Sequence, residues 1–302
     1  MVKPLVTIVT VTYNLIKNER KKQFIQSLES VQNQTYKNIE HIVIDGASND
    51  GTVEMIKEYA DKGWVKYISE PDNGLYDAMN KGAIMAQGKY LIFLNSDDFF
   101  SGNEGIEKSV KALEKANADY SYTKAIILDP GGNRIILHPH SQINFSQIFV
   151  DMPFCHQTLM VKTDIFKQVG MFDLQYKSAG DYDFVLRLFF NKHKQVYVPY
   201  EFVTFRRGGY SLENEDLSIR EVSSFYQRYY NRLCKLSFEE CKNIYTSKKV
   251  PLRLLIKSIP YFDYENKIKI YKRIVNELRK KFFRICLSKN APSLVILGIK
   301  IV

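Results

Sequence analysis

The chain of 302 residues has little of what would place it in several common classes of protein. Its four cysteines are scattered, so neither a disulfide framework nor a zinc cluster is expected. No apolar run reaches the ~20 residues that cross a bilayer. The N-terminus leads directly into an apolar strand, without the features of a signal peptide. We therefore expect a cytoplasmic protein.

Glycine is missing where the common nucleotide-binding motifs require it. The first predicted strand runs into Thr12-Tyr13-Asn14-Leu15. A dinucleotide-binding Rossmann unit needs G-x-G-x-x-G at this point, and a P-loop needs G-x-x-x-x-G-K-[ST]. The absence of both motifs argues against a dinucleotide-binding Rossmann unit and against a P-loop.

Short apolar runs alternate with helical patterns over the first hundred residues. The runs at 5–11 and 39–44 are rich in β-branched residues and end at polar turns, and further strands are expected at 64–69 and 89–94. Apolar residues at helical spacing separate them. The alternation predicts an α/β fold with a mixed, mainly parallel sheet flanked by helices.

Polar clusters follow three of these strands. They are Thr12-Tyr13-Asn14, the segment from Asp45 to Asp50, and Asn95-Ser96-Asp97-Asp98. Ligands of open α/β sheets collect beyond the carboxyl ends of the strands. A single crevice is therefore expected to gather these side chains.

Five motifs occur in order within the same hundred residues: TIVTVTYN at 7–14, SLESVQNQTY at 27–36, IVIDGASNDGT at 42–52, DNGLYDAMNKG at 72–82 and FLNSDD at 93–98. Together they resemble the GT-A fold of nucleotide-diphospho-sugar transferases, and more closely the family 2 inverting glycosyltransferases. The resemblance implies a catalytic domain over 1–215, with a nucleotide-binding half at about 1–100 and an acceptor half at about 101–215. A helical, basic C-terminal region would occupy 216–302.

The resemblance places the nucleotide near the first two polar clusters. A carboxylate such as Asp45 can accept the N3–H of uracil, while Thr12, Tyr13 and Asn14 are expected to contact the base and ribose. A capping role for Asp45 in the following turn is the alternative.

Asn95-Ser96-Asp97-Asp98 stands where the family has its D-x-D motif, with Asn replacing the first acid. Hard oxygen ligands suit Mg²⁺ or Mn²⁺, which would bridge the donor diphosphate. We therefore expect Asp97 and Asp98 to hold the metal, and Asn95 and Ser96 to contact the donor. The alternative is a turn that caps a helix.

Two further segments contain the residues expected to contact the donor sugar and the residue expected to act as the catalytic base. The resemblance implies donor contacts for Asp77 and Asn80, although an exposed helix face would explain Asn80 as well. The segment from Ser178 to Arg187 is similar to the family's E-D-Y-D helix start, with Gly180 in place of Glu. Asp181 then matches the acid that deprotonates the acceptor; a charge at a helix N-terminus is the structural alternative.

Two elements are expected to complete the site. Cys155-His156-Gln157 resembles an element near the acceptor side of the cleft, so His156 and Gln157 are candidate acceptor contacts. The segment that begins at Arg206 and Arg207 resembles a loop that closes over the diphosphate, and arginine side chains bind phosphate groups well. A structural histidine and a solvated loop are the alternatives.

Net charge is concentrated at the C-terminus. Residues 248–302 hold fourteen Lys and Arg against three acids, which is +11, so the total of +10 leaves −1 for the rest. Cations interleaved with apolar residues favour amphipathic helices on an anionic lipid surface, at the inner face of the cell membrane. A helical appendage or a contact between copies of the chain is the alternative. Nothing in the remaining sequence supports nucleic-acid binding.

The preferred hypothesis is an enzyme that transfers a sugar from a nucleotide donor, expected to be UDP-linked, to a hydroxyl of a surface polysaccharide or lipid-linked saccharide. A catalytically silent carbohydrate- or nucleotide-binding module is a second hypothesis. A sugar-nucleotide nucleotidyltransferase is a third, but it lacks the expected triphosphate loop after the first strand. Pocket shape, which distinguishes hexoses from their N-acetyl forms, is not readable from the sequence.

Overall fold

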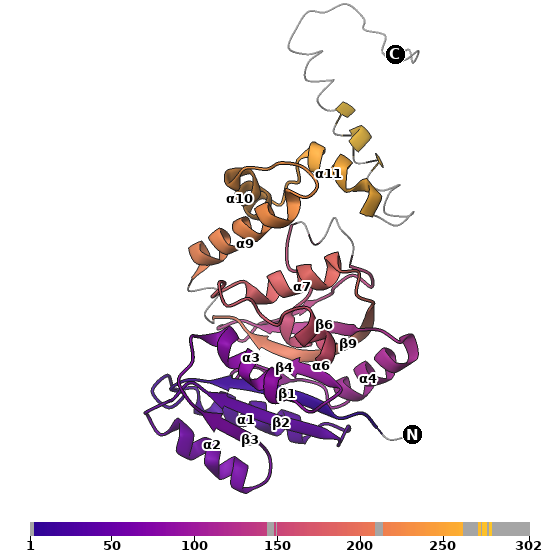
Figure 1. Cartoon of the computed structure of the whole chain (residues 1–302). Coiled ribbons are helices and arrows are strands. Elements are labelled where there is room, and N and C mark those ends of the chain that lie inside the picture. The colour runs from indigo at the N-terminus through magenta and orange to yellow at the C-terminus, as the bar shows by residue number, and fades with distance from the viewer. Residues whose placement is uncertain are drawn as a thin grey trace, which may run out of the picture.

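The computed structural model describes residues 3–143, 148, 150–208 and 214–261, together with 271, 272, 274–276, 278 and 279. Within these residues a nine-stranded sheet is flanked by helices, as Figure 1 shows. The main path of the sheet is β3-β2-β1-β4-β8-β6-β9-β5, and β7 pairs with β6 at one side. The predicted α/β class is confirmed.

The N-terminal part of the sheet is parallel, because helices connect its strands and return the chain to the same edge. Its elements are β1 (Val6–Thr12), α1 (Lys21–Gln32), β2 (Ile39–Asp45), α2 (Thr52–Asp61), β3 (Lys66–Ser69), α3 (Leu75–Met85) and β4 (Tyr90–Phe93). β1 lies between β2 and β4 and is buried along its whole length. The carboxyl ends of these strands therefore open at one edge of the sheet.

The remaining strands extend the sheet with mixed directions. The elements are β5 (Phe99–Phe100), α4 (Gly105–Ala116), β6 (Tyr120–Leu128), β7 (Arg134–Leu137), β8 (Met160–Lys162), α6 (Thr163–Gln168), α7 (Gly180–Phe190) and β9 (Gln195–Arg206). β8 runs antiparallel to both β4 and β6. Phe99 pairs with Thr204, which brings the polar segment after β4 beside the end of β9.

A helical layer covers α7. It comprises α9 (Glu215–Tyr230), α10 (Phe238–Ser247) and α11 (Leu252–Ser258), and in Figure 1 it lies at the end of the molecule away from α1 and α2. Side chains of all three helices belong to the same hydrophobic core as β1 and α3. Among the described helices, none combines the length and the apolarity that crossing a bilayer would require. Most of the predicted basic tail, 262–270 and 280–302, lies outside the described residues.

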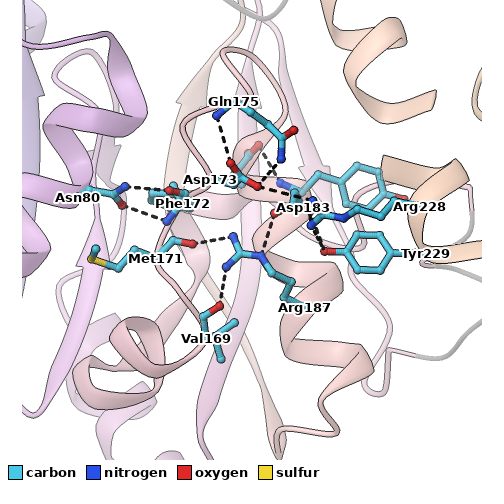
Figure 2. A network of polar contacts seen from close by, with 12 residues as sticks. Asn80, Val169, Met171, Phe172, Asp173, Gln175, Asp183, Arg187, Arg228 and Tyr229 are labelled. Atoms are coloured by element: carbon cyan, nitrogen blue, oxygen red, sulfur yellow. Dashed lines mark hydrogen bonds and ion pairs between the residues drawn. The ribbon is translucent and has the colours of Figure 1, made fainter. Parts of the chain in front are cut away.

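A buried ion-pair network fastens α9 to α7 (Figure 2). The Asp183 carboxylate is fully buried and accepts hydrogen bonds from Arg187 Nε at 2.8 Å and from the Tyr229 hydroxyl at 2.9 Å. Arg187 also donates to two backbone carbonyls in the segment 169–171. One carboxylate thus joins two helices and the loop before α7.

Substituting this carboxylate tests how much the helical layer depends on it. We expect Asp183→Asn to lower the free energy of unfolding by about 3 kcal/mol, because it leaves the Arg187 guanidinium, whose side chain is only 14% exposed, without its counter-charge. Urea denaturation followed by circular dichroism measures the change. The exposed Asp61 at the end of α2 supplies the control, Asp61→Asn, which we expect to change stability by less than about 0.5 kcal/mol. Equal stability of the two variants would contradict the role of Asp183.

Candidate active site

A cavity of about 1400 Å³ opens beyond the carboxyl ends of β1 and β4. Its walls also include the first turns of α3 and α7, a 3₁₀ turn at His156–Thr158 and the end of β9. Most of the predicted site residues line it: Thr12, Tyr13, Asp77, Asn95, Ser96, Asp97, His156, Gln157, Asp181, Arg206 and Arg207. The position is the one where open α/β sheets bind ligands.

Tyr13 and Asp72 mark one end of the cavity. The Tyr13 side chain is 62% exposed. Beside it stands Gly46, where a Cβ atom would come within 2.6 Å of Asp72 Oδ2 and 3.3 Å of the Tyr13 ring. The other Asp72 oxygen accepts the Gly74 backbone N–H at 2.8 Å. A carboxylate and an exposed aromatic ring are therefore presented side by side.

Asp45, the predicted contact for the base, lies beneath the cavity rather than in its wall. It is fully buried and accepts hydrogen bonds from the hydroxyls of Thr12, Ser48 and Ser69 and from the Ser48 backbone N–H, at 2.6 to 2.9 Å. Both oxygens are thus occupied. The predicted role for Asp45 does not fit this geometry, since its carboxylate fixes the turn after β2; Asp72, which the sequence analysis missed, faces the cavity instead.

Two other predicted donor contacts also brace the scaffold. Asn14 Oδ1 accepts the Asn49 backbone N–H at 3.1 Å. The buried Asn80 amide exchanges two hydrogen bonds with the backbone of Phe172, at 2.9 and 3.0 Å, as Figure 2 shows. Neither side chain lines the cavity. For Asn80, the structure places a polar side chain where the buried backbone of Phe172 would otherwise be unpaired.

The acidic pair after β4 divides into one reachable and one buried carboxylate. Asp97 lines the cavity, its side chain is 20% exposed, and it pairs with Arg20 at 3.2 Å. Asp98 is fully buried and accepts hydrogen bonds from Gln157 Nε2 at 2.6 Å and from the Arg206 backbone N–H at 2.8 Å. Burial, followed by the neighbouring charge of Asp97, raises the pKa of Asp98 to about 7. The predicted metal role fits Asp97 but does not fit Asp98, which holds β4 to β9.

The side chains around Asp97 could bind a divalent metal only together with ligands that come from the substrate and from water. No group of three His, Cys, Asp or Glu side chains is placed to hold an ion within the described part of the chain. Mg²⁺-type sites often use one or two carboxylates together with substrate phosphate oxygens and water. Asp97 can supply one such carboxylate, and Asn95 Oδ1, which is buried and has no partner among the described residues, offers a neutral oxygen beside it. Arg206 and Arg207 line the same region.

Asp181 begins α7 on another wall of the cavity. Its Oδ1 accepts hydrogen bonds from the Tyr76 hydroxyl and the Tyr182 backbone N–H, both at 2.9 Å, and its Oδ2 lies 3.1 Å from His156 Nδ1. Burial alone would raise the pKa of Asp181, but the hydrogen bonds from His156 and Tyr76 outweigh it and hold that pKa below its ordinary value. Asp181 is therefore an anion at neutral pH.

Gly180 and Glu221 set the position of Asp181. A Cβ atom at Gly180 would approach the Tyr76 ring to 2.9 Å, so glycine leaves room for the tyrosine that binds Asp181. The buried Glu221 carboxylate of α9 accepts the backbone N–H groups of three consecutive residues, 177–179, at 2.6 to 2.9 Å. Gly180 is visible in the sequence as a departure from the family's motif, whereas no local pattern indicates Glu221, which is distant along the chain.

Comparisons with known proteins agree with this architecture. The model of the family described as glycosyl transferase family 2 matches residues 7–170, more than half of the chain. An uncharacterised glycosyltransferase of Mycobacterium tuberculosis is 32% identical over 190 residues, which are 61% of this chain and 68% of the relative.

Two solved structures share the fold. TarS 1-349 of S. aureus in complex with UDP-GlcNAc has a TM-score of 0.62 at 17% identity, with 92% of each chain covered. Mannosyltransferase PcManGT from Pyrobaculum calidifontis, in complex with GDP-Man and Mn²⁺, has a TM-score of 0.59 at 14% identity, covering 92% of this chain and 81% of the other. The predicted GT-A-type architecture is confirmed, and with the family match it follows that the chain belongs to the family 2 glycosyltransferases.

Proposed function

We propose that this glycosyltransferase moves a sugar from a UDP-linked donor to a saccharide hydroxyl with inversion at the anomeric carbon. The observation that carries the proposal is that one cavity joins Asp97 and the Arg206 and Arg207 side chains to the Asp181 carboxylate. Cations and a carboxylate able to share a metal suit a leaving diphosphate. A separate carboxylate suits the removal of a proton from the acceptor, which an inverting transfer requires.

The nucleotide base would lie against Tyr13. Aromatic rings stack on bases, at about 1–3 kcal/mol per base. Asp72 would then accept the N3–H of uracil in the role that the sequence analysis gave to Asp45. The solved TarS complex holds UDP-GlcNAc and the PcManGT complex holds GDP-Man, so guanine is the competing base for this end of the cavity.

The diphosphate would lie between Asp97 and the end of β9. Mn²⁺, named in the PcManGT complex, or Mg²⁺ would be held by Asp97 together with the diphosphate oxygens. When bound, the metal supplies positive charge that stabilises the departing nucleoside diphosphate. Arg206 and Arg207 add cations at the same end of the cavity. The sugar would extend from there toward Asp77 and Asp181.

The transferred sugar is proposed to be a hexose or an N-acetylhexosamine, and the acceptor a hydroxyl of a surface polysaccharide or a lipid-linked saccharide. The basic region at 248–302 would hold the enzyme at the inner face of the membrane, where such an acceptor is found. The described part of this region supports the idea, since Tyr271, Val275 and Leu278 expose 46 to 53% of their surface. Exposed apolar residues among cations are typical of an interfacial helix.

The proposed role of Asp181 is tested by a donor screen. We expect UDP release from at least one UDP-sugar in the presence of Mn²⁺, and a loss of about 10³-fold in kcat for Asp181→Asn, because the acceptor proton loses its carboxylate. Asp164, which is exposed in the first turn of α6, gives the matched control Asp164→Asn. No UDP release from any donor, with or without cell-extract acceptors, would leave only a silent binding module.

The proposed roles of Asp97 and Asp72 differ in their metal dependence. By titration calorimetry we expect Asp97→Asn to weaken UDP binding about 10- to 100-fold with Mn²⁺ and to abolish the difference between Mn²⁺ and EDTA. We expect Asp72→Asn to weaken UDP binding by a similar factor while that difference remains, because its carboxylate faces the base. If both variants respond alike to EDTA, the two ends of the donor site are wrongly assigned.

The membrane proposal is tested by flotation with anionic and neutral liposomes. Leu254 and Leu255 are buried in the core, so the truncation must begin after residue 261 to spare α11. We expect the full chain to float with anionic vesicles at low salt and the truncated chain to stay in the soluble fraction, because the cations are lost. Equal recovery of both proteins in the soluble fraction removes the membrane role.

A further inference from the structure

Arg20 and Asp97 form an ion pair in the wall of the cavity. Arg20 Nη1 lies 3.2 Å from Asp97 Oδ2, and the two side chains are 40% and 20% exposed. Both residues line the cavity, Arg20 from the position just before α1 and Asp97 from the segment after β4. The carboxylate that is proposed to hold the metal therefore already has a cation beside it.

Arg206, which lines the same end of the cavity, is held differently from Arg20. Its guanidinium donates hydrogen bonds to the Asp97 backbone carbonyl and to Gln26 Oε1, so it contacts neutral groups of the scaffold. Among the described residues, the Arg20 side chain has one polar contact, which is the Asp97 carboxylate. Arg20 is thus the arginine that neutralises this carboxylate and that depends on it for a partner.

The backbone of Arg20 is fixed independently of its side chain. Its N–H donates to the Leu15 carbonyl at 2.8 Å, and its carbonyl accepts the Phe24 N–H at 3.0 Å at the start of α1. A partly exposed ion pair contributes little to stability, so the guanidinium can leave Asp97 without disturbing the helix. The side chain can therefore change its partner while the residue stays in place.

Arg20 and a divalent metal would compete for the same carboxylate. Both carry positive charge, so Asp97 can be shared between them only at the cost of their mutual repulsion. A nucleoside diphosphate removes this conflict, because its oxygens bind the metal and also accept strong hydrogen bonds from arginine. A guanidinium released from Asp97 would then find a new anionic partner in the cavity that it already lines.

We infer that Arg20 exchanges its partner when the donor binds: it holds Asp97 in the absence of nucleotide, and it passes to the donor diphosphate as the carboxylate takes up the metal. This inference rests on the proposed function. The exchange would keep metal binding weak until nucleotide is present. It would also couple the two ligands, since each binds more tightly in the presence of the other.

A fixed brace is the competing interpretation of the same ion pair, and it predicts a change of opposite sign. If Arg20 only holds Asp97 in place, removing the guanidinium loosens the carboxylate and weakens Mn²⁺ binding. If Arg20 competes for the carboxylate, removing it strengthens Mn²⁺ binding. The affinity of the full-length protein for Mn²⁺ without nucleotide therefore distinguishes the two interpretations.

Electron paramagnetic resonance measures this affinity, because free Mn²⁺ gives a sharp signal that is lost on binding. Without nucleotide, we expect Arg20→Gln to bind Mn²⁺ about tenfold more tightly than the wild type, and the gain to disappear in the Arg20→Gln/Asp97→Asn double variant. We expect Arg20→Lys, which keeps the charge, to bind as weakly as the wild type. Unchanged or weaker Mn²⁺ binding by Arg20→Gln overturns the inference.

The matched control is an arginine in another exposed ion pair. Arg253 pairs with Glu240, the two side chains are 53% and 40% exposed, and neither residue lines the cavity. We expect Arg253→Gln to leave the Mn²⁺ affinity unchanged. Circular dichroism of each variant verifies that it is folded before its affinity is compared.

UDP binding gives a second readout that does not require turnover. By titration calorimetry we expect Arg20→Gln to weaken UDP binding about tenfold with Mn²⁺ but less than about threefold in EDTA, because without metal Arg20 stays on Asp97. An arginine that contacts phosphate under both conditions would lose the same factor in each. Equal losses with Mn²⁺ and with EDTA would therefore contradict the exchange.

The outcomes separate the inference from the proposed function. If the wild type binds UDP with Mn²⁺ but Arg20→Gln binds Mn²⁺ no more tightly, the exchange fails while the donor site stands. If the wild type binds no UDP and releases none from any UDP-sugar, the proposed function fails. The Mn²⁺ affinities without nucleotide then still decide whether Arg20 competes for Asp97.

Discussion

Glu221 accepts hydrogen bonds from three consecutive backbone amides at the start of α7, and the position of Asp181 depends on this contact. The first amides of a helix have no partner within the helix, and a negative charge at this end is also favoured by the helix dipole. Because Glu221 belongs to α9, the C-terminal helices are part of the site's support. The buried Asp183 network makes the same connection one turn further along α7.

Buried and reachable carboxylates alternate around the cavity and have different tasks. Asp45, Asp98 and Asp183 are fully buried, and each accepts several hydrogen bonds that tie neighbouring elements together. Asp97 and Asp181 line the cavity, where Asp97 pairs with Arg20 and Asp181 with His156. A buried anion is tolerated only where donors surround it, so the scaffold carboxylates have no capacity left for a ligand. The two classes share the same short motifs.

The sequence was sufficient to predict the strand and helix alternation and the edge of the sheet where the site forms, and most of the site residues predicted from it line the cavity. It did not separate Asp97 from Asp98, because adjacent residues on a turn differ only in the direction of their side chains. It also assigned the base contact to Asp45 rather than Asp72. That distinction depends on the space above Gly46, which a side chain from another loop fills. The Glu221 contact spans more than forty residues and has no local pattern.

The contacts that hold Asp181 also keep its carboxylate in the form that the proposed transfer needs. A carboxylate at a helix N-terminus, with a tyrosine hydroxyl and an imidazole N–H as donors, is stabilised as an anion. The same stabilisation leaves the carboxylate charged and able to receive a proton. Arg206 and Arg207 also line the cavity, and the Arg206 guanidinium donates hydrogen bonds to the Asp97 carbonyl and to Gln26. Under the proposed function, these cations would face the leaving diphosphate, and Asp181 would face the acceptor hydroxyl.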